Sequence, residues 1–478
     1  MREQRRFYMD VIQNPSEVTG SFTLHVTKID DKVIKYVTDC GMYQEKEYEK
    51  QNKVFPVEPS EVEFVVITHC HTDHIGRLPY FVKKGFRGKI YMTEISAELI
   101  GKSLYNGAQI IHDTSKRKNE SPLYDATDVA SVLNLIEPCK YNQSIRVNEN
   151  MTLTFVPNAH LPGAAAILNQ IHSPGDGKDI NLFSTGDYNN KNMFFPVSPI
   201  RSWIKDLPIT MITESTYGEM DSSEIQNVFE TNILKALVEH KTIVIPVFSL
   251  ARAQEVLSLL KTWQIFYPKL FKNVQIYYDG KLSFYYTDKY NEMIRSGLFN
   301  VFEDKRDFLP KNLTYVNDKA LRKRIINNNN CKIIVATSGW GTYGPTQTYL
   351  PALIGKPKVL IHFTSGYCAE ETLAYKLKHA NFGDDVKIGG VMAIKRAQVE
   401  FTNELSGHAK ADELIGNIKG FNKLQFVLVN HGPKSAEDKM AKRILKETGV
   451  ENVGILGRGY CYRIDPNGFV KSYSTEYL

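Results

Sequence analysis

Metal-binding side chains are concentrated in one six-residue segment, His69-Cys70-His71-Thr72-Asp73-His74. Histidine and aspartate are common zinc ligands in proteins. The two-residue spacing of His69 and His71 cannot place both rings on one face of a helix, whereas a turn that leaves a strand can direct both at one ion. Asp73 and His74 could bind a second cation, and two adjacent ions can hold an attacking hydroxide and a substrate oxygen together. The segment therefore predicts a hydrolytic site with two metal ions.

Three further candidate ligands follow predicted strands elsewhere in the chain. They are His160 after residues 151–157, Asp187 after residues 181–184 and His431 after residues 425–429. A histidine by itself is more often a core or surface residue than a ligand. Three such residues, each at a strand end near a glycine, favour a shared role in the metal site.

Asp39 is a candidate for a supporting role behind the ligands. It ends the predicted strand at residues 33–38 and precedes Cys40-Gly41. A carboxylate at this place could hold a ligand histidine in orientation, but a solvated turn aspartate is an equally good interpretation. Cys70 lies between two candidate ligands, and we expect its side chain to point away from the metal.

The elements that would position these residues are short strands alternating with helices, which predicts the α/β class. Each predicted strand is an apolar, β-branched run that ends in a small or polar cluster. The other predicted strands are residues 62–68, 209–213, 242–247, 274–278, 332–336 and 359–363. The predicted helices, with apolar residues three and four apart, are residues 249–263, 370–380, 410–419 and 435–447.

Two polar segments are predicted to be exposed turns or loop tips. Residues 113–119 are polar and partly basic, and residues 327–330 are four consecutive asparagines. The chain contains no convincing internal repeat and no extended low-complexity tract. A second domain would therefore be inserted without a long disordered linker.

Length and composition are those of a large globular protein. A chain of 478 residues suits two or three domains. Hydrophobic residues make up 42% and charged residues 23%, which excludes disorder as a description of the whole chain. The formal net charge of +6 permits an anionic substrate such as nucleic acid but does not require one.

The cysteines and the N-terminal segment predict a cytoplasmic location. The six cysteines are scattered and form no C-x-x-C pair, so we expect reduced thiols. Residues 1–7 (MREQRRF) lack the apolar core of a signal peptide. No apolar stretch approaches the roughly 20 residues that a membrane span needs.

The candidate residues, taken in order, resemble the successive motifs of the metallo-β-lactamase superfamily. The motifs are Asp39, the segment 69–74, His160 and Asp187. Downstream the resemblance narrows to the β-CASP branch, nucleic-acid-processing nucleases that carry an extra domain inserted into the lactamase-like one. The segments that resemble this branch are residues 212–218 (ITESTYG), 248–255 (FSLARAQE), 405–409 (LSGHA) and 429–432 (VNHG).

The resemblance assigns each candidate residue a role. One zinc ion would be bound by His69, His71 and His160, the other by Asp73, His74 and His431, with Asp187 bridging them; manganese could substitute for zinc. The two ions would activate a water molecule for in-line attack on a phosphodiester. Glu214 and His408 would form a carboxylate–imidazole pair beside the leaving oxygen, without binding metal.

The resemblance also implies an RNA substrate, most simply single-stranded RNA. In the family, a histidine at the position of His431 accompanies RNA-processing members, whereas the DNA-repair branch tends to have valine. The chain ends soon after the last motif, so the expected match is a compact bacterial or archaeal ribonuclease without the extra C-terminal domain of RNase J or of the pre-mRNA 3′-end endonuclease. Residues 430–434 (NHGPK) depart from the family, which usually has an apolar residue before the histidine and glutamate after the glycine.

The motif order implies a domain organisation. An αββα lactamase-like sandwich would comprise residues 1–205 and 390–478, with the α/β β-CASP domain inserted at residues 206–389. The sequence leaves a homodimer open.

Candidate phosphate contacts lie in loops that follow predicted strands of the inserted domain. They are Arg252, Lys281, Ser338 and Ser365, where small residues and glycine let backbone amides approach a phosphate. Trp340 or Tyr367 could stack on a base, although burial is the more common role of such aromatic residues. The basic segments 319–324 and 395–396 are more typical of solvated faces than of an RNA track.

Three alternatives to a ribonuclease remain open. The first is a DNA nuclease of the same branch. The second is a small-molecule hydrolase that cleaves a thioester or lactam, which would not need the roughly two hundred residues between Asp187 and His408, about a domain's worth. The third is a non-catalytic binding subunit, against which stands the presence of every expected ligand.

Overall fold

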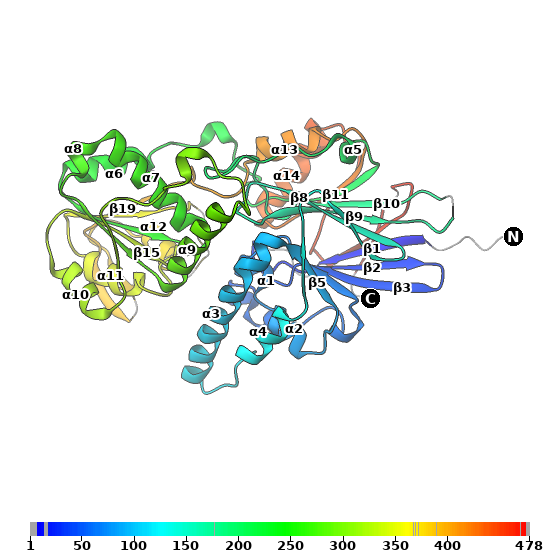
Figure 1. Cartoon of the computed structure of the whole chain (residues 1–478), viewed down its shortest axis with the longest axis horizontal. Coiled ribbons are helices and arrows are strands. Elements are labelled where there is room, and N and C mark those ends of the chain that lie inside the picture. The colour runs from blue at the N-terminus through cyan, green and yellow to red at the C-terminus, as the bar shows by residue number, and fades with distance from the viewer. Residues whose placement is uncertain are drawn as a thin grey trace. The chain divides into compact units, whose positions relative to one another are not determined.

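The computed structural model describes residues 7–13, 18–175, 177–366, 368, 370, 372–388, 390–468 and 470–474. The chain forms two compact units (Figure 1). Unit 1 comprises Met1–Asn192, Val197–Ser223 and Gly407–Leu478, and unit 2 comprises Met193–Pro196 and Glu224–Ser406. Both units alternate strands and helices, so the predicted α/β class is confirmed.

Unit 1 contains two packed sheets. The first sheet has the order β23 (Val470–Ser474), β22 (Tyr460–Ile464), β1 (Phe7–Gln13), β2 (Thr23–Ile29), β3 (Lys32–Thr38), β4 (Phe64–Val66), β5 (Lys89–Thr93) and β6 (Ile136–Cys139). The second has the order β21 (Val453–Ile455), β20 (Leu424–Asn430), β11 (Ile209–Glu214), β10 (Ile180–Ser184), β9 (Ala165–Ile171), β8 (Met151–Pro157) and β7 (Ser144–Asn148).

The core of unit 1 lies between these sheets and continues under the helices of the second sheet. Alternate residues of each strand, such as Met9 and Val11 on β1 and Leu153 and Phe155 on β8, meet between the sheets because strand side chains alternate between faces. The opposite face of the second sheet packs against α5 (Ser202–Lys205), α13 (Ala411–Lys419) and α14 (Lys434–Glu447).

The first sheet is covered on its outer side by α2 (Leu78–Lys83), α3 (Glu94–Lys118) and α4 (Ala126–Leu133). Figure 1 shows these blue and cyan helices outside one sheet, and the orange α13 and α14 outside the other. The layers are therefore helix, sheet, sheet, helix. This confirms the predicted αββα sandwich.

The prediction that residues 113–119 form a loop is wrong, because α3 continues to Lys118. The helix is capped at its start by Thr93, whose side chain accepts a hydrogen bond from the backbone N–H of Ser96. Its buried residues end at Ala108, so the remaining turns are a solvated extension without apolar periodicity. Three basic residues in the last turn interact favourably with the negative end of the helix dipole. Asn119 ends the helix in the left-handed conformation, at φ 54°.

Unit 2 is built on a six-stranded sheet in which every pairing is parallel. Its order is β14 (Leu313–Tyr315), β13 (Gln275–Asp279), β15 (Lys332–Thr337), β12 (Thr242–Val247), β16 (Val359–Phe363) and β19 (Gln398–Phe401). A separate hairpin is formed by β17 (Asp385–Ile388) and β18 (Val391–Ile394). The helices of this unit are α6 (Phe229–Val238), α7 (Arg252–Phe266), α8 (Pro268–Phe271), α9 (Lys281–Ser296), α10 (Lys319–Asn327), α11 (Thr346–Leu353) and α12 (Leu373–His379).

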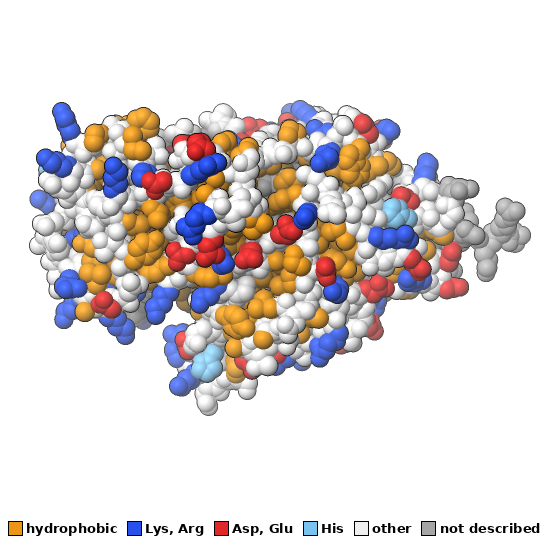
Figure 2. All heavy atoms as spheres, viewed as in Figure 1, with side chains coloured by type: hydrophobic (Ala, Val, Ile, Leu, Met, Phe, Trp, Pro, Cys, Tyr) orange, Lys and Arg blue, Asp and Glu red, His pale blue; other side chains and the backbone are white. Residues whose placement is uncertain are grey.

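The core of unit 2 places α10, α11 and α12 against the parallel sheet. The asparagine run at residues 327–330 follows at the end of α10, and residues 328–330 lie outside any helix or strand, as predicted. None of the described helices is both long and apolar enough to cross a membrane. On the face drawn in Figure 2, acidic and basic side chains are interspersed, so the mild positive net charge is not gathered there into one basic track.

The predicted domain boundaries, 205/206 and 389/390, differ from the main boundaries between the two units, which lie at 223/224 and 406/407. Strand β11 pairs in parallel with β10 and β20, so residues expected to open the inserted domain instead complete the second sheet of unit 1. Strand β19 pairs with β16, so residues expected in the return segment belong to the sheet of unit 2.

Candidate metal centre

The seven predicted ligands lie on turns that follow strands of unit 1. His69 and His71 follow β4, and Asp73 and His74 lie on the short helix α1 (Thr72–Ile75). His160, Asp187 and His431 follow β8, β10 and β20. The structure brings them into two groups that share Asp187: His69, His71, His160 and Asp187, and Asp73, His74, Asp187 and His431.

The first group has the spacing of a tetrahedral site. His71 Nδ1 lies 3.2 Å from His69 Nε2 and 3.1 Å from His160 Nε2. Asp187 Oδ2 lies 3.5 Å from His69 Nε2 and 3.6 Å from His160 Nε2. Ligands at the zinc–nitrogen distance of ~2.0–2.1 Å in a tetrahedron would be roughly 3.3–3.4 Å apart. The four atoms therefore surround a point that a zinc ion fits.

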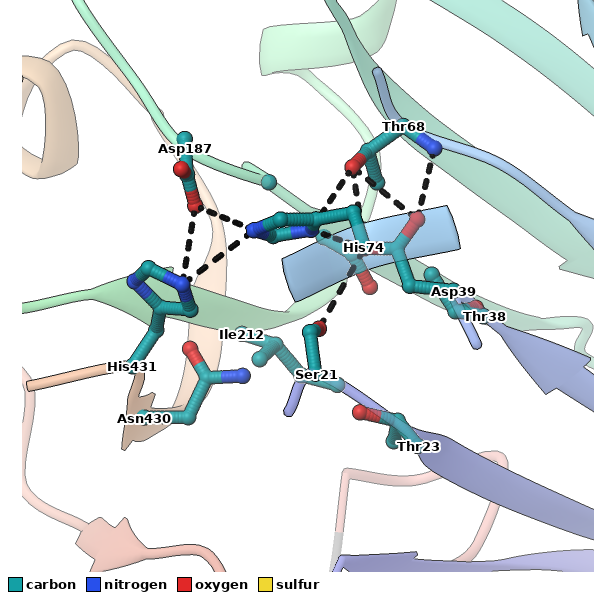
Figure 3. Close-up of a pocket in the computed structure, with 12 residues that line it drawn as sticks. Ser21, Thr23, Thr38, Asp39, Thr68, His74, Asp187, Ile212, Asn430 and His431 are labelled. Carbon is teal, nitrogen blue, oxygen red and sulfur yellow. Dashed lines mark hydrogen bonds and ion pairs between the residues drawn. The ribbon is translucent and has the colours of Figure 1, made fainter. Parts of the chain in front are cut away.

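The second group is arranged in the same way around the other oxygen of Asp187. Asp187 Oδ1 lies 3.2 Å from His74 Nε2 and 3.4 Å from His431 Nε2, and these two nitrogens are 3.2 Å apart. Asp73 Oδ2 is farther, at 3.7 Å from His74 Nε2 and 3.8 Å from His431 Nε2. Figure 3 shows His74, His431 and Asp187 pointing toward one another from three elements.

The chemistry of these groups fits metal ions. Asp187 is 2% exposed, and its Oδ1 atom has no hydrogen-bond partner among the described residues. A buried carboxylate is costly unless it is paired or coordinates a metal. Imidazole nitrogens and carboxylate oxygens that converge on one point form a ligand set for a cation.

The outer nitrogens of three ligand histidines, His74, His160 and His431, contact fixed oxygens. His74 Nδ1–H donates to Asp39 Oδ2 at 2.7 Å, and His160 Nδ1–H donates to the Gly407 carbonyl at 2.9 Å. Thr216 Oγ1 lies 3.2 Å from His431 Nδ1. Such partners set the ring orientation and leave the other nitrogen directed at the metal.

Asp39 lies behind His74 and not in solvent. It is 2% exposed, and its carboxylate also accepts hydrogen bonds from the backbone N–H and the hydroxyl of Thr68. Both Asp39 (φ 61°) and His431 (φ 50°) have the left-handed backbone conformation, which is uncommon for residues other than glycine and often occurs at functional sites. The sequence-based alternative of a solvated turn aspartate therefore does not hold.

Gly41 is required where the loop after Asp39 meets α1. A Cβ atom on Gly41 would lie 1.5 Å from the carbonyl oxygen of Asp73. Backbone N–H groups of Cys40 and Met42 donate to the carbonyls of His74 and Thr72, at 2.7 and 3.1 Å. This close approach fixes α1, and with it two candidate ligands, against the loop.

The electrostatics of the two groups differ. Burial lowers the pKa of His71 to about 4 and those of His69 and His160 well below the usual value, so these rings are neutral, as metal binding requires. Burial also lowers the pKa of His431, but Asp187 and Asp73 more than offset it and raise the pKa to about 9. The second group thus favours positive charge.

Arg77 supports the site but was not singled out in the sequence. It is 2% exposed, and its Nε–H donates to the Gly41 carbonyl, while its Nη1 atom donates to the carbonyls of Gln51 and Val54 at 3.0 and 3.2 Å. Three aromatic rings surround the guanidinium at 5.1–5.4 Å: Phe22, Tyr43 and Phe55. The available signal was a basic residue inside the apolar run that follows His74.

Glu214 and His408 form the expected pair. His408 Nδ1 lies 2.9 and 3.0 Å from the two carboxylate oxygens of Glu214, which is 1% exposed. His408 Nε2 lies 3.8 Å from Asp187 Oδ2, and His408 belongs to neither metal group. Glu214 therefore accepts a hydrogen bond from Nδ1–H and leaves Nε2 directed toward the metal centre.

The departure from the family pattern at residues 430–434 has a local explanation. Asn430 Nδ2 donates to Gln13 Oε1 at 3.2 Å, and the same oxygen accepts from Thr23. A polar residue before His431 thus has a partner on β1. Pro433 precedes the first residue of α14, Lys434, where its missing N–H costs no helix hydrogen bond.

The predicted phosphate contacts all lie in unit 2, at the carboxyl ends of parallel strands. Arg252, Lys281, Ser338 and Ser365 follow β12, β13, β15 and β16. Ligands of parallel sheets commonly bind at this edge. Arg252 is already paired, 2.7 Å from Glu255.

The remaining residues named in the sequence analysis are the two aromatic candidates for base stacking and Cys70. Trp340 packs edge-on against Phe248, with ring centroids 5.5 Å apart, and Tyr367 lies outside the described residues. Cys70 donates its thiol hydrogen to the Ser96 carbonyl, and burial raises its pKa to about 12. Cys70 therefore points away from the ligands, as expected.

The sequence is similar over most of its length to several named proteins. Ribonuclease TTHA0252 of Thermus thermophilus is 27% identical over 84% of this chain and 89% of its own length. An RNase J-like protein of Methanocaldococcus jannaschii is 28% identical over 86% and 90%. Transcription termination factor FttA of Methanosarcina mazei is 25% identical over 84% of this chain and 62% of its own length.

A solved structure shares the fold. A protein of unknown function from Enterococcus faecalis V583 matches with a TM-score of 0.52 and 11% identity, over 98% of this chain and 100% of that one. Family models match three parts of the chain: the metallo-beta-lactamase superfamily at residues 26–142, the Beta-Casp domain at residues 253–377 and the Zn-dependent metallo-hydrolase RNA specificity domain at residues 394–454. With its two groups of histidines and aspartates, the chain belongs to the metallo-β-lactamase superfamily and, within it, to the β-CASP branch of hydrolytic enzymes.

Proposed function

We propose that the protein is a zinc-dependent ribonuclease that hydrolyses RNA phosphodiester bonds with two metal ions. The observation that carries this proposal is the pair of ligand groups that share Asp187, with His408 Nε2 3.8 Å from the same carboxylate. Relatives named as ribonucleases and the match to an RNA specificity domain support RNA as the substrate. We assign the lactamase-like domain to unit 1 and the β-CASP domain to unit 2.

The residues of the chain divide the chemistry between them. His69, His71 and His160 would hold one ion, Asp73, His74 and His431 the other, and Asp187 would contact both. Bound zinc ions would supply Lewis acidity at the scissile phosphate and lower the pKa of an attacking water. Asp39 and Thr216 keep the rings of His74 and His431 in place.

Glu214 and His408 would handle the proton of the leaving group. With its Nδ1 proton held by the buried carboxylate, His408 can present a proton at Nε2 to the departing 3′ oxygen. Arg252, Lys281, Ser338 and Ser365 would contact phosphates of the RNA from unit 2, and Arg252 would first have to leave Glu255.

We expect two zinc ions per chain. Protein purified without chelator and then reloaded with zinc should contain both when measured by elemental analysis, because two complete ligand groups are present. Manganese should also bind, since histidine and carboxylate ligands tolerate it. A content of one zinc ion per chain would contradict the role proposed for Asp73, His74 and His431.

We expect cleavage of RNA to be faster than cleavage of single-stranded DNA of the same sequence. End-labelled substrates carrying a 5′ phosphate or a 5′ hydroxyl would also distinguish internal cleavage, which releases fragments, from processive cleavage, which releases mononucleotides. Comparable rates on RNA and DNA would restore the DNA nuclease alternative. Turnover of a thioester or lactam without any cleavage of RNA would favour the small-molecule hydrolase.

A further inference from the structure

A small cavity lies behind the second metal group, between the two sheets of unit 1 (Figure 3). The centre of a water molecule could move within about 20 Å³ of this cavity. By the same measure, one buried water needs roughly 10–15 Å³. The lining comes from both sheets and from the turns beside them, and most of it is polar; it includes Thr38, His74, Ser184, Asp187 and His431. The cavity therefore has the size and the character of a site for water.

Two oxygens on the cavity wall have no hydrogen-bond partner among the described residues. They are Ser184 Oγ and Asp187 Oδ1, and the two residues are only 5% and 2% exposed. Buried polar atoms almost always have a partner in the protein or in ordered water. Asp187 Oδ1 faces His74 and His431 at 3.2 and 3.4 Å, but a carboxylate oxygen can accept more than one contact.

Thr38 contributes a third polar group to the wall. Its Oγ1 atom lies 3.0 Å from Nε2 of His25, which is fully buried and stacks on Tyr36 with ring centroids 4.4 Å apart. Burial lowers the pKa of His25 to about 3, so this ring is neutral. A neutral imidazole can donate to Thr38 Oγ1 and leave the threonine hydroxyl hydrogen for a molecule in the cavity.

The polar lining continues inward from the cavity on both sheets. On β2, His25 and Thr27 follow Thr23 at two-residue steps and thus share its face, and His25 Nδ1 and Thr27 Oγ1 have no partner among the described residues. On the other sheet, Asn169 pairs with Leu182, and both of its amide atoms are buried without a partner. Such an interior is expected to be hydrated, whereas an apolar void stays dry.

We propose that the cavity binds one resident water molecule that bridges Ser184 Oγ and Asp187 Oδ1. The water accepts a hydrogen bond from the Ser184 hydroxyl and donates one to Asp187. Ser184 is therefore a positioning residue for the carboxylate that both ligand groups share, as Asp39 is for His74. This inference rests on the metal centre of the proposed function.

A high-resolution crystal structure of the zinc-loaded protein should show a water peak within hydrogen-bond distance of Ser184 Oγ and Asp187 Oδ1. Ser184→Ala should weaken zinc binding by ~10–100-fold, the usual cost of losing a partner behind a metal ligand. Competition with a chelator measures this without any activity assay. Ser258→Ala, which also removes a buried serine hydroxyl but from unit 2, should leave zinc affinity unchanged.

Absence of the water peak in the wild-type protein would overturn the inference. Wild-type zinc affinity in Ser184→Ala would also overturn it, because the water would then not position Asp187. Failure of the metal centre itself has a different signature, since the wild-type protein would bind no zinc at all. Thermal unfolding of each variant without metal shows whether the fold is retained.

Discussion

Replacing Asp187 with alanine is expected to remove both zinc ions and to abolish cleavage of RNA. Asp187 is the one residue that the two ligand groups share, with one carboxylate oxygen directed at each. Each group would keep only three ligands and would lose its shared anion. The fall in rate should exceed the ~10²–10⁴-fold that the loss of an acid–base group costs. Elemental analysis and single-turnover cleavage measure the two effects.

The matched control is Asp179→Ala. Asp179 is also an aspartate of unit 1 that contacts a histidine, His172 at 2.9 Å, but its side chain is 37% exposed. We expect this variant to keep two zinc ions and the wild-type rate. If Asp187→Ala retained two zinc ions, the shared position of its carboxylate would have no role in metal binding.

Replacing His408 with alanine is expected to lower the rate of RNA cleavage by ~10²–10⁴-fold while leaving two zinc ions in place. His408 lies outside both ligand groups, and its Nδ1 atom is bound by Glu214. Removal of its ring would therefore remove a proton donor without removing a ligand. Single-turnover rates at saturating RNA, measured with the zinc content of the same sample, separate the two effects.

Two further variants serve as controls for His408→Ala. His431→Ala should lose both the second zinc ion and activity, because His431 belongs to a ligand group. His112→Ala should change neither, since its side chain is 60% exposed on α3. If His408→Ala emptied a metal site, His408 would be a ligand and the proton donor would lie elsewhere. An unchanged rate would leave His408 as a residue that precedes α13 without catalytic role.

The ligand set could be predicted because each member follows a strand that is itself evident in the sequence. Three strands have the predicted bounds: residues 151–157, 242–247 and 359–363. Each is a short apolar, β-branched run that ends in a small or polar cluster, a pattern that favours a strand over a helix. The end of a strand fixes where its following turn must lie. His160 and Asp187 could thus be placed by type and position alone.

Features that depend on tertiary contacts could not be predicted. The predicted helix at residues 249–263 begins at Arg252, because Ala251 adopts a left-handed φ of 68° that no local pattern signals. The partners of Arg77 come from carbonyls and rings of three separate segments, so its burial is invisible in a linear pattern. The polar residues Thr38 and Ser184 lie on strands that look ordinary in sequence, and only the packing of the two sheets brings them to one cavity.

The order of the ligands along the chain has a consequence for folding during synthesis. His69, His71, His160 and Asp187 all precede unit 2, whereas His431 follows it, directly after β20, the strand that must pair with β11. Domains generally fold as units, the N-terminal parts first, and pairing of distant segments is slow. A nascent chain could therefore assemble the first ligand group while unit 2 is still being translated. The second group must wait for the last part of unit 1, so its occupancy would report that β20 has paired with β11.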